Sequence, residues 1–272
     1  LLIFKKSTGI IRSVKTLNCN KLILSGGVLG SVKLLLRCKA KGSLPRLSDQ
    51  LGNFVRTNSE AIIGVKLKKT PKEDFTKGIA ISAGFYPDKD THIETVRYGK
   101  GQTAMALLTT FLPDRGIPLP RFFRWGISVL RHPVEFISNI IPLKWARKTV
   151  ILLVMQPISN YLKLEYKSRW WRFGGKSINS HSSTGERIPS HIPIGEKIAE
   201  YIANKKNGTI VTSYMDSLFG IPTTAHILGG ACLSRNENEG VIDEKCEVFQ
   251  YPGMYIIDGS SIPSNLSNFP IE

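Results

Sequence analysis

The stretch Lys21-Leu22-Ile23-Leu24-Ser25-Gly26-Gly27-Val28-Leu29-Gly30 joins a short apolar strand to a glycine-rich turn. The residues that follow predict a helix over positions 31–39, with Leu34, Leu35 and Leu36 supplying its buried side. Strand, glycine turn and helix in this order are the arrangement that a doubly wound α/β domain uses at its ligand-facing edge. The beginning of the chain is therefore expected to belong to an α/β domain.

The same turn comes close to the dinucleotide fingerprint GxGxxG, in which glycines let the backbone approach a pyrophosphate. Ser25 stands at the first glycine position, however, and no acidic residue follows about 20 residues on at the end of a second strand. Close packing of the helix against the strand explains these glycines better. The turn does not form a complete phosphate-binding loop.

The rest of the chain predicts a sheet-rich middle between two α/β pieces. Positions 3–18 predict a hairpin that turns at Ser7-Thr8-Gly9, and strand-like segments follow at 61–66, 78–84, 91–98 and 150–156. A proline- and aromatic-rich region, 112–145, contains short helical patches such as 122–130. Positions 193–206 predict an amphipathic helix with a proline in its first turn and Asn207-Gly208 as its stop. We expect an α/β (α+β) protein divided at 1–60, 61–220 and 221–272.

The composition is that of a globular protein with an unusually basic surface. The net charge is +16, from 37 Lys and Arg against 21 Asp and Glu. Such a balance is typical of a solvated surface, or of a protein that binds anionic membranes or nucleic acid. The charges are spread thinly, and neither a zinc-finger spacing nor a single-strand-binding aromatic signature is present, so nucleic acid is not expected as a partner. A solvated surface and an anionic membrane surface remain as alternatives.

The four cysteines and the apolar runs limit metal and membrane roles. Cys19, Cys38, Cys232 and Cys246 form no CxxC pair and have no histidine at metal-ligand spacing, so we expect no metal site. Free thiols are the simplest reading, with a disulfide between Cys232 and Cys246 as the alternative. No apolar run approaches the roughly 20 residues that span a bilayer. The chain begins without Met, which leaves cytoplasmic and secreted locations open.

His226 is the strongest candidate for a catalytic residue. It lies in Thr223-Thr224-Ala225-His226-Ile227-Leu228-Gly229-Gly230, where an imidazole precedes backbone that lacks Cβ atoms. A group with an ordinary pKa of about 6.5 suits removal of the proton of an alcohol while hydride leaves the adjacent carbon. The alternative is a core histidine that caps a loop.

Asp258 and Gly259 follow an apolar strand expected over 254–257. Ligands of open α/β sheets bind beyond the carboxyl ends of strands, so this carboxylate is placed to accept hydrogen bonds from the hydroxyls of a cofactor. Gly259 would let the backbone approach a flat ring. The alternative is an Asx turn or a helix N-cap, for which Asp-Gly-Ser is a common sequence.

Glu94 lies in a segment, 91–98, in which His92, Glu94, Val96 and Tyr98 share one face of a strand. This mixture suits the wall of a cavity better than a dry core. A carboxylate in an apolar cavity has a raised pKa and can carry a proton. The alternative is a surface glutamate that pairs with Arg97 or a neighbouring lysine.

Taken together, these residues resemble the glucose-methanol-choline (GMC) flavoenzymes, and more narrowly their cholesterol oxidase-like branch. The matching stretches occur in the order found in the family and spread through nearly all of the chain: 21–37, 51–60, 91–101, 223–230, 240–243 and 251–263. The resemblance implies an FAD-binding domain of the glutathione-reductase type and a substrate domain with a mostly antiparallel sheet. By position, His226 matches the active-site histidine, Glu94 the glutamate that moves a proton during double-bond isomerisation, and Asp258 with Gly259 the flavin contacts.

The chain also departs from the family pattern at both ends. The N-terminal GxGxxG unit that should hold the FAD diphosphate is absent, so we expect the C-terminal half of a longer protein. At the other end, Phe269 stands where the family has an asparagine that faces flavin and substrate, and Asn268 lies one position early. These departures make a catalytically incomplete or non-catalytic lipid-surface protein the main alternative.

The leading hypothesis is an FAD-dependent oxidoreductase that acts on the 3-hydroxyl of a sterol or a similar bulky hydrophobic alcohol. It implies FAD as cofactor, a sterol-like substrate and oxygen as electron acceptor. A GMC enzyme for another alcohol is the competing enzymatic reading.

Overall fold

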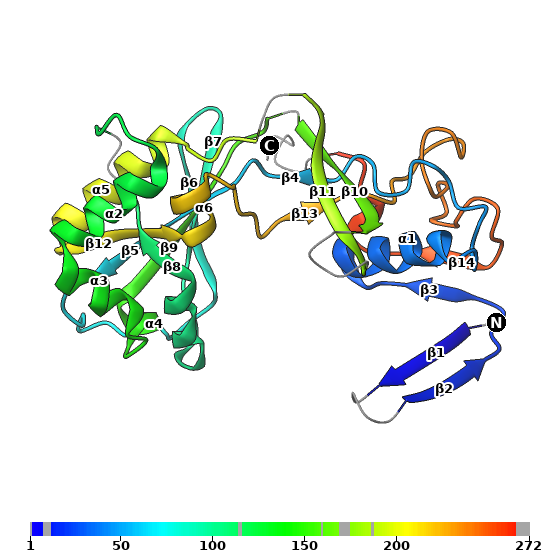
Figure 1. The fold of residues 1–272 in the computed structure, drawn as a ribbon, viewed down its shortest axis with the longest axis horizontal. Helices are drawn as coiled ribbons and strands as arrows, with labels where there is room; N and C mark the ends of the chain where they lie inside the picture. The colour runs from blue at the N-terminus through cyan, green and yellow to red at the C-terminus, as the bar shows by residue number, and fades with distance from the viewer. Residues whose placement is uncertain are drawn as a thin grey trace. The chain divides into compact units, whose positions relative to one another are not determined.

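The computed structural model describes residues 2–7, 12–113, 116–158, 160–168, 175–185 and 188–264 (Figure 1). The chain divides into two compact units. Unit 1 contains the described parts of Leu1–Arg56, Tyr161–Gly185 and Ile227–Asn265, and unit 2 contains those of Thr57–Asn160 and Glu186–His226. We describe each unit by itself.

Unit 1 begins with the hairpin that the sequence predicts. Strands β1 (Leu2–Ser7) and β2 (Arg12–Leu17) pair in antiparallel fashion, while the Ser7-Thr8-Gly9 turn falls largely outside the described residues. Strand β3 (Leu22–Leu24) then pairs in parallel with β14 (Met254–Ile256). Because parallel strands end at the same edge, the turn after β3 and the turn after β14 are brought together.

The expected helix after β3 is present, but its buried face differs from the prediction. A π-helical segment, η1 (Val28–Val32), continues into α1 (Lys33–Ala40), and its buried apolar side chains are Val28, Val32 and Leu35. Leu34 is 45% exposed, so the expectation that three consecutive leucines are buried was wrong. Successive residues of a helix are rotated by about 100°, and only residues three or four apart share a face.

Two further strands of unit 1, β10 (Asn160–Ser168) and β11 (Lys176–Gly185), pair with each other and were not predicted. Their sequences mix lysine, serine and apolar residues without a long apolar run, so periodicity gave only a weak signal. The unit also holds β13 (Ile227–Leu228) and the short helix η4 (Gly259–Ser261). Its core gathers residues from distant segments, among them Val32, Leu51, Val55, Leu164, Ile242 and Ile256.

Unit 2 is built on a six-stranded sheet in the order β6-β7-β9-β5-β12-β8. The strands are β5 (Ala61–Leu67), β6 (Ile81–Asp88), β7 (Thr91–Val96), β8 (Thr109–Phe111), β9 (Thr149–Met155) and β12 (Gly208–Ser213). Every pairing between them is antiparallel, which confirms the expected sheet type. Strand β6 begins later than the predicted segment 78–84 and contains Pro87, which is tolerated because β6 lies at the sheet edge. The two-residue strand β4 (Arg56–Thr57) lies where the chain passes from unit 1 to unit 2.

Successive side chains of β9 point to opposite faces of this sheet, and each face carries its own hydrophobic cluster. Leu152 and Val154 pack in a cluster with Ala199 and Ala203 of α5 (Pro193–Lys206). Ile151, Leu153 and Met155 pack in another cluster with Trp145 of α4 (Trp145–Lys148) and Ala106 of η2 (Lys100–Leu108). Helix α5 has the predicted bounds, because Pro193 suits its first turn and Asn207 ends it in a left-handed conformation (φ 51°).

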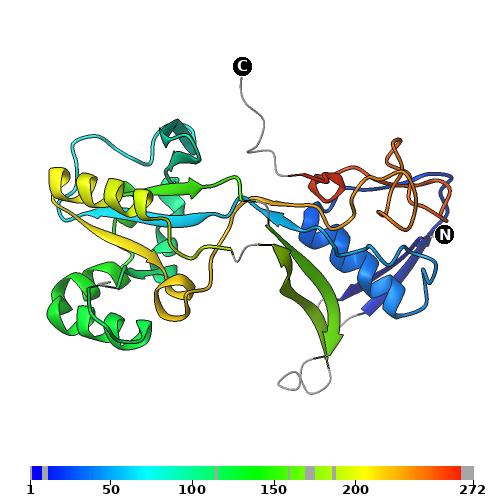
Figure 2. The same ribbon diagram turned by 90° about the horizontal axis from the view of Figure 1, so that it is seen from above.

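Helices α2 (Arg121–Arg131) and α3 (Pro133–Ile140) lie on the face opposite α5, as Figure 2 shows. They confirm the helical patches expected in the aromatic-rich region. A short helix, α6 (Tyr214–Phe219), packs against α2, and the guanidinium of Arg121 pairs with Asp216 of α6 at 3.0 Å. None of the helices in the described part of the chain is long and apolar enough to cross a membrane.

Candidate functional site

His226 lies at the end of unit 2 and is held by the carboxylate of Glu60, the residue directly before β5. The imidazole Nδ1 is 3.3 Å from Oε2 of Glu60. The same oxygen accepts hydrogen bonds from the Thr224 hydroxyl at 2.8 Å and from the Ala225 backbone N–H at 2.7 Å. The side chain of Glu60 is fully buried, whereas that of His226 is 35% exposed. His226 is therefore anchored through one ring nitrogen and still reachable by solvent.

The surroundings of His226 raise its pKa above the ordinary histidine value. The hydrogen bond to Glu60 is the largest cause, burial acts in the opposite direction, and the negative charges of Glu60 and Glu94 add to the increase. A neighbouring carboxylate stabilises the imidazolium, so the ring becomes a stronger base. This is the property expected of a group that takes a proton from an alcohol.

Glu60 is a site residue that the sequence did not single out. It is only the last residue of the matching stretch 51–60, where no role was expected for it. A signal was present: a carboxylate stands directly before the apolar strand β5, most of whose residues are buried. Acidic side chains are almost never fully buried unless they are paired, so an acid at such a position indicates a specific partner.

Glu94 lies on the same face of the sheet as Glu60. It pairs across β7 and β9 with Leu153, and Ala61 pairs across β5 and β9 with Val154. Because side chains alternate along a strand, Glu60 and Glu94 both point to the face of Leu153. The expected neighbours of Glu94 on that face, Val96 and Tyr98, pack against the cluster around Trp145.

Each of these glutamates keeps one buried oxygen without a hydrogen-bond partner among the described residues. These atoms are Oε1 of Glu60 and Oε2 of Glu94. Buried polar atoms in native proteins are nearly always satisfied, and exceptions indicate a ligand, a water or a proton that moves. The sheet face that carries both glutamates, one of which binds His226, therefore has unused acceptor capacity suited to proton transfer.

Asp258 and Gly259 belong to unit 1, where they follow β14. Asp258 Oδ1 accepts from the Ser260 backbone N–H at 2.8 Å and from the Ser260 hydroxyl at 2.5 Å, so Asp258 caps the helix η4. Burial opposes ionisation of Asp258, but hydrogen bonds from Ser260, Ser31 and the Gly27 backbone outweigh it and lower the pKa of Asp258. Asp258 therefore has the N-cap role that the sequence offered as an alternative, and this role is compatible with contacts to a cofactor.

The glycine turn after β3 offers open backbone near Asp258. A Cβ atom added at Gly27 or Gly30 would meet nothing within 4 Å, and Gly27 has a φ of +68°. The turn is tied to the β14 side by the Ser25 hydroxyl, which donates to the Ile257 carbonyl at 2.8 Å. Open glycines beside an ionised carboxylate fit a planar cofactor that carries hydroxyl groups, such as FAD. By contrast, a Cβ at Gly259 would come within 3.3 Å of the Leu228 side chain.

The glycine pair after His226 is explained by packing within unit 1. Gly229 and Gly230 have φ values of +81° and +95°. A Cβ at Gly229 would lie 2.1 Å from the Phe54 carbonyl oxygen, and one at Gly230 would lie 2.9 Å from Val32. These positions accept only glycine because the chain itself approaches them closely.

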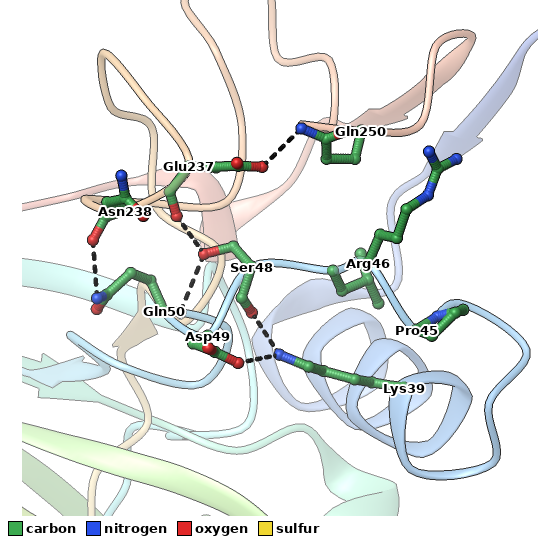
Figure 3. A pocket seen from close by; sticks show the side chains of 10 residues that line it. Lys39, Pro45, Arg46, Ser48, Asp49, Gln50, Glu237, Asn238 and Gln250 are labelled. Atoms are coloured by element: carbon green, nitrogen blue, oxygen red, sulfur yellow. Dashed lines mark hydrogen bonds and ion pairs between the residues drawn. The ribbon is translucent and has the colours of Figure 1, made fainter.

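A separate polar cavity of about 540 Å³ lies in unit 1 (Figure 3). Its side chains bind one another: Lys39 pairs with Asp49 at 2.6 Å, and the Gln50 amide donates to the Asn238 carbonyl at 2.9 Å. None of His226, Glu94, Asp258 or Gly259 lines this cavity. It is therefore not the candidate site.

The remaining expectations concern the chain end and the cysteines. Phe269 and Asn268 lie outside the described residues. All four cysteines are free thiols, so the alternative of a Cys232–Cys246 disulfide was wrong. Cys232 is buried, and burial raises the pKa of its thiol.

Comparison with known proteins agrees with the resemblance. Residues 179–271 match the family model described as GMC oxidoreductase. A cholesterol oxidase from Acinetobacter baumannii is 38% identical over 257 residues, which are 94% of this chain and 45% of that protein. A cholesterol oxidase from Mycobacterium tuberculosis (strain CDC 1551 / Oshkosh) is 39% identical over 264 residues, 95% of this chain and 45% of that protein.

The chain thus spans about half the length of the curated relatives that it matches. Among solved structures, an FAD-dependent oxidoreductase from Chaetomium thermophilum matches 96% of this chain and 54% of that chain, with 13% identity and a TM-score of 0.38. This score is too low to carry an argument. On the family model and the 38–39% identity along nearly its whole length, the chain belongs to the GMC oxidoreductase family.

Proposed function

We propose that the protein is an FAD-dependent oxidoreductase that oxidises the 3-hydroxyl of a sterol or a similar bulky hydrophobic alcohol. Two of its relatives are cholesterol oxidases, which supports the substrate class. The observation that carries the proposal is the imidazole of His226, which is partly exposed, is hydrogen-bonded to the buried carboxylate of Glu60 and is also affected by the negative charge of Glu94. An exposed base of raised pKa is what removal of an alcohol proton requires.

In the proposed reaction, His226 accepts the hydroxyl proton while the carbinol carbon loses hydride, so the alcohol becomes a ketone and loses two electrons. FAD, the cofactor of this family, supplies the hydride acceptor when bound, and we propose oxygen as the final electron acceptor. We propose that Asp258, whose pKa is lowered, is ionised and accepts hydrogen bonds from the cofactor, with Gly259 beside it and the open backbone at Gly27 and Gly30 completing this cradle.

Glu94 is proposed as a second proton carrier, which moves a proton when the double bond of a sterol ketone shifts into conjugation. Its support is the buried Oε2 atom that has no partner among the described residues. The division of labour that we propose gives the cofactor to residues 1–60 and 221–272 and the substrate to 61–220.

The test of the catalytic proposal is the variant His226→Ala in the full-length protein. We expect the rate of alcohol oxidation to fall by about 10²- to 10⁴-fold, the usual contribution of a general acid or base. The flavin absorbance of the purified protein should stay unchanged, which separates catalysis from cofactor loss. An unaltered turnover rate with the variant would overturn the assignment.

A second candidate function, attachment to an anionic membrane surface, is favoured by the surface of α2 and α3. The apolar side chains of these helices and the following turn include several that are more than half exposed: Phe122, Phe123, Leu130, Val134, Ile137 and Leu143. Residues 116–148 carry six basic residues and one acidic residue, Glu135. An apolar face flanked by positive charge is typical of a helix that lies in the interface of an anionic bilayer.

Binding to vesicles tests this second function without reference to catalysis. Vesicles that contain phosphatidylserine should retain the protein and release it as salt is raised, and pure phosphatidylcholine vesicles should bind it weakly. Leu130→Ser combined with Val134→Ser should weaken retention by at least about tenfold, because each buried apolar side chain contributes roughly 1.5–3 kcal/mol. Ile79→Ser, at a residue that is 71% exposed and outside these helices, is the matched control. Equal retention of the unaltered protein, the double variant and Ile79→Ser would show that α2 and α3 do not bind the membrane.

A further inference from the structure

We infer that Glu60 is the positioning residue of His226, which fixes the tautomer of the imidazole and keeps Nε2 available as the proton acceptor. The inference rests on the proposed function of His226 as a base. No role for Glu60 follows from the sequence motifs, and its contact with His226 spans 166 positions. All of the contacts that carry the inference lie within unit 2.

Oxygen Oε2 of Glu60 is an acceptor. The Ala225 N–H can only donate, and it lies 2.7 Å from this oxygen. The Thr224 hydroxyl also donates to it, at 2.8 Å. Since an ionised carboxylate can only accept, the hydrogen in its contact with Nδ1 of His226 comes from the ring, which places the ring proton on Nδ1.

With the proton on Nδ1, the lone pair of the neutral ring resides on Nε2. No described residue forms a hydrogen bond with Nε2, and the side chain is partly exposed. A buried carboxylate behind one nitrogen of a catalytic imidazole selects the tautomer and stabilises the imidazolium that forms when the other nitrogen takes a proton. Glu60 therefore acts through His226 rather than on a substrate.

The backbone before Glu60 is built to hold this side chain in place. Ser59 is buried and has a φ of +46°, a left-handed conformation that is uncommon for residues other than glycine. Its hydroxyl accepts a hydrogen bond from the Asn160 amide at 2.9 Å, and the Asn58 carbonyl accepts one from the Gln156 N–H at 3.0 Å. Such strained positions persist only where the surroundings fix them, and they cluster at functional sites.

The competing explanation is that Glu60 merely anchors the loop through Thr224 and Ala225. The two explanations differ in what they predict for the ring itself. An anchor leaves the tautomer and the titration of His226 unaffected, whereas a positioning residue sets both. The charged and titratable groups that act on this ring are Glu60 and Glu94, with Tyr98 beside Glu60, so the readout must separate these two carboxylates.

The first measurement concerns the unaltered ring. In the full-length protein labelled with ¹⁵N-histidine, the signal of His226, assigned by its loss in His226→Ala, should report the Nδ1–H tautomer above the pKa of the ring. That pKa should lie above the ordinary value of about 6.5. A ring protonated on Nε2 in the unaltered protein would overturn the inference directly.

The second measurement compares Glu60→Gln with Thr224→Val in the FAD-loaded protein. Glu60→Gln keeps an oxygen that can accept from Ala225 and Nδ1 but removes the negative charge that stabilises the imidazolium, so we expect kcat to fall by about 10- to 100-fold. The pH at which kcat/KM reaches half its maximum should move to lower pH, because the carboxylate that raises the pKa of His226 is gone. Thr224→Val removes one anchoring bond and should leave both the tautomer and the pH profile unchanged.

The outcomes separate this inference from the proposed function. If His226→Ala keeps its turnover rate, the catalytic proposal fails, while the ring tautomer still shows whether Glu60 sets it. If His226→Ala is inactive but Glu60→Gln and Thr224→Val give the same pH profile, the role of Glu60 alone is refuted. Glu60→Asp, which keeps the charge, should restore the raised pKa in part, and failure to do so would also count against the inference.

Discussion

The hydroxyl of Ser31 donates a hydrogen bond to Oδ2 of Asp258 at 2.5 Å, across 227 positions of sequence. This bond joins the segment after β3 to the segment after β14, the two places where parallel strands of unit 1 end. Since Ser31 also accepts from the Gly26 N–H at 3.0 Å, one side chain ties the glycine turn to the carboxylate. The geometry of the glycine turn and the ionisation of Asp258 are therefore linked.

Asp258→Ala should lower both stability and flavin content. Loss of the cap and of the Ser31 bond should cost about 1–2 kcal/mol in the free energy of unfolding at pH 7. The pKa of Asp258 is lowered by its hydrogen bonds, so this stability is present above the unfolded value of about 3.9 and is lost as pH falls through the folded value. Urea midpoints of the two proteins should therefore converge at acid pH. A difference that stays constant with pH, or an equal effect of Asp88→Ala at the exposed end of β6, would contradict this reading.

Glu94→Gln should separate oxidation from isomerisation. The amide cannot carry a proton, so movement of the double bond should slow by about 10²-fold or more while alcohol oxidation changes only a few-fold. The measurement follows the unconjugated and conjugated sterol ketones by ultraviolet absorbance. Glu73→Gln, at an exposed position, serves as the control. Parallel loss of both activities would show that Glu94 does not have a separate proton-carrying role.

Lys66 should give the protein a pH-dependent stability in the alkaline range. Burial lowers its pKa to about 8, and its ammonium donates to the Ser138 hydroxyl at 3.2 Å and to the Ser138 carbonyl. Between about pH 8 and the unfolded value near 10.4, the unfolded chain binds more protons than the native one, so the contribution of Lys66 to stability rises with pH. Lys66→Met lacks this contribution. Urea unfolding at pH 7 and pH 10 measures this effect. From pH 7 to pH 10, the free energy of unfolding of the unaltered protein should rise by up to about 3 kcal/mol relative to that of Lys66→Met. A difference between the two proteins that does not change with pH would disprove the effect of Lys66.

Gly229→Ala should unfold unit 1 or weaken it severely. The new methyl group would lie 2.1 Å from the Phe54 carbonyl oxygen, and the φ of +81° disfavours any side chain. We expect a loss of at least about 3 kcal/mol in the free energy of unfolding. Gly30→Ala is the matched control, because its methyl group meets nothing within 4 Å and lies in a helix, where alanine gains up to about 1 kcal/mol. The measurement is the melting temperature of both variants. Similar melting temperatures would contradict the claim that a methyl group at position 229 clashes with the Phe54 carbonyl.

Local sequence signals identified several of the main elements of the fold, although strands such as β8 and β12 of the six-stranded sheet were not predicted. The apolar run of β9 and the proline and asparagine that bound α5 are features that a single segment contains, and both elements formed as expected. The buried face of α1 was misjudged, because three consecutive leucines were read without the helical rotation that exposes Leu34. Strands β10 and β11 were missed since their polar residues left no clear alternation.

The candidate site shows the same division between local and distant information. His226 and Asp258 were found from their neighbours in sequence, a glycine pair and an apolar strand. Glu60 was not, because its partners Thr224, Ala225 and His226 lie more than 160 positions away. Only the pairing of β5 with its neighbours, followed by the return of the chain after α6, brings this carboxylate to the imidazole.

The amino-acid sequence alone predicted the α/β character, the family and the candidate site residues His226, Glu94, Asp258 and Gly259, because periodicity and short motifs report backbone preferences and burial. The folded structure decided which oxygen faces which nitrogen. Hydrogen-bond partners that are far apart in the chain are chosen by packing, and packing sums over the whole core rather than over any one segment.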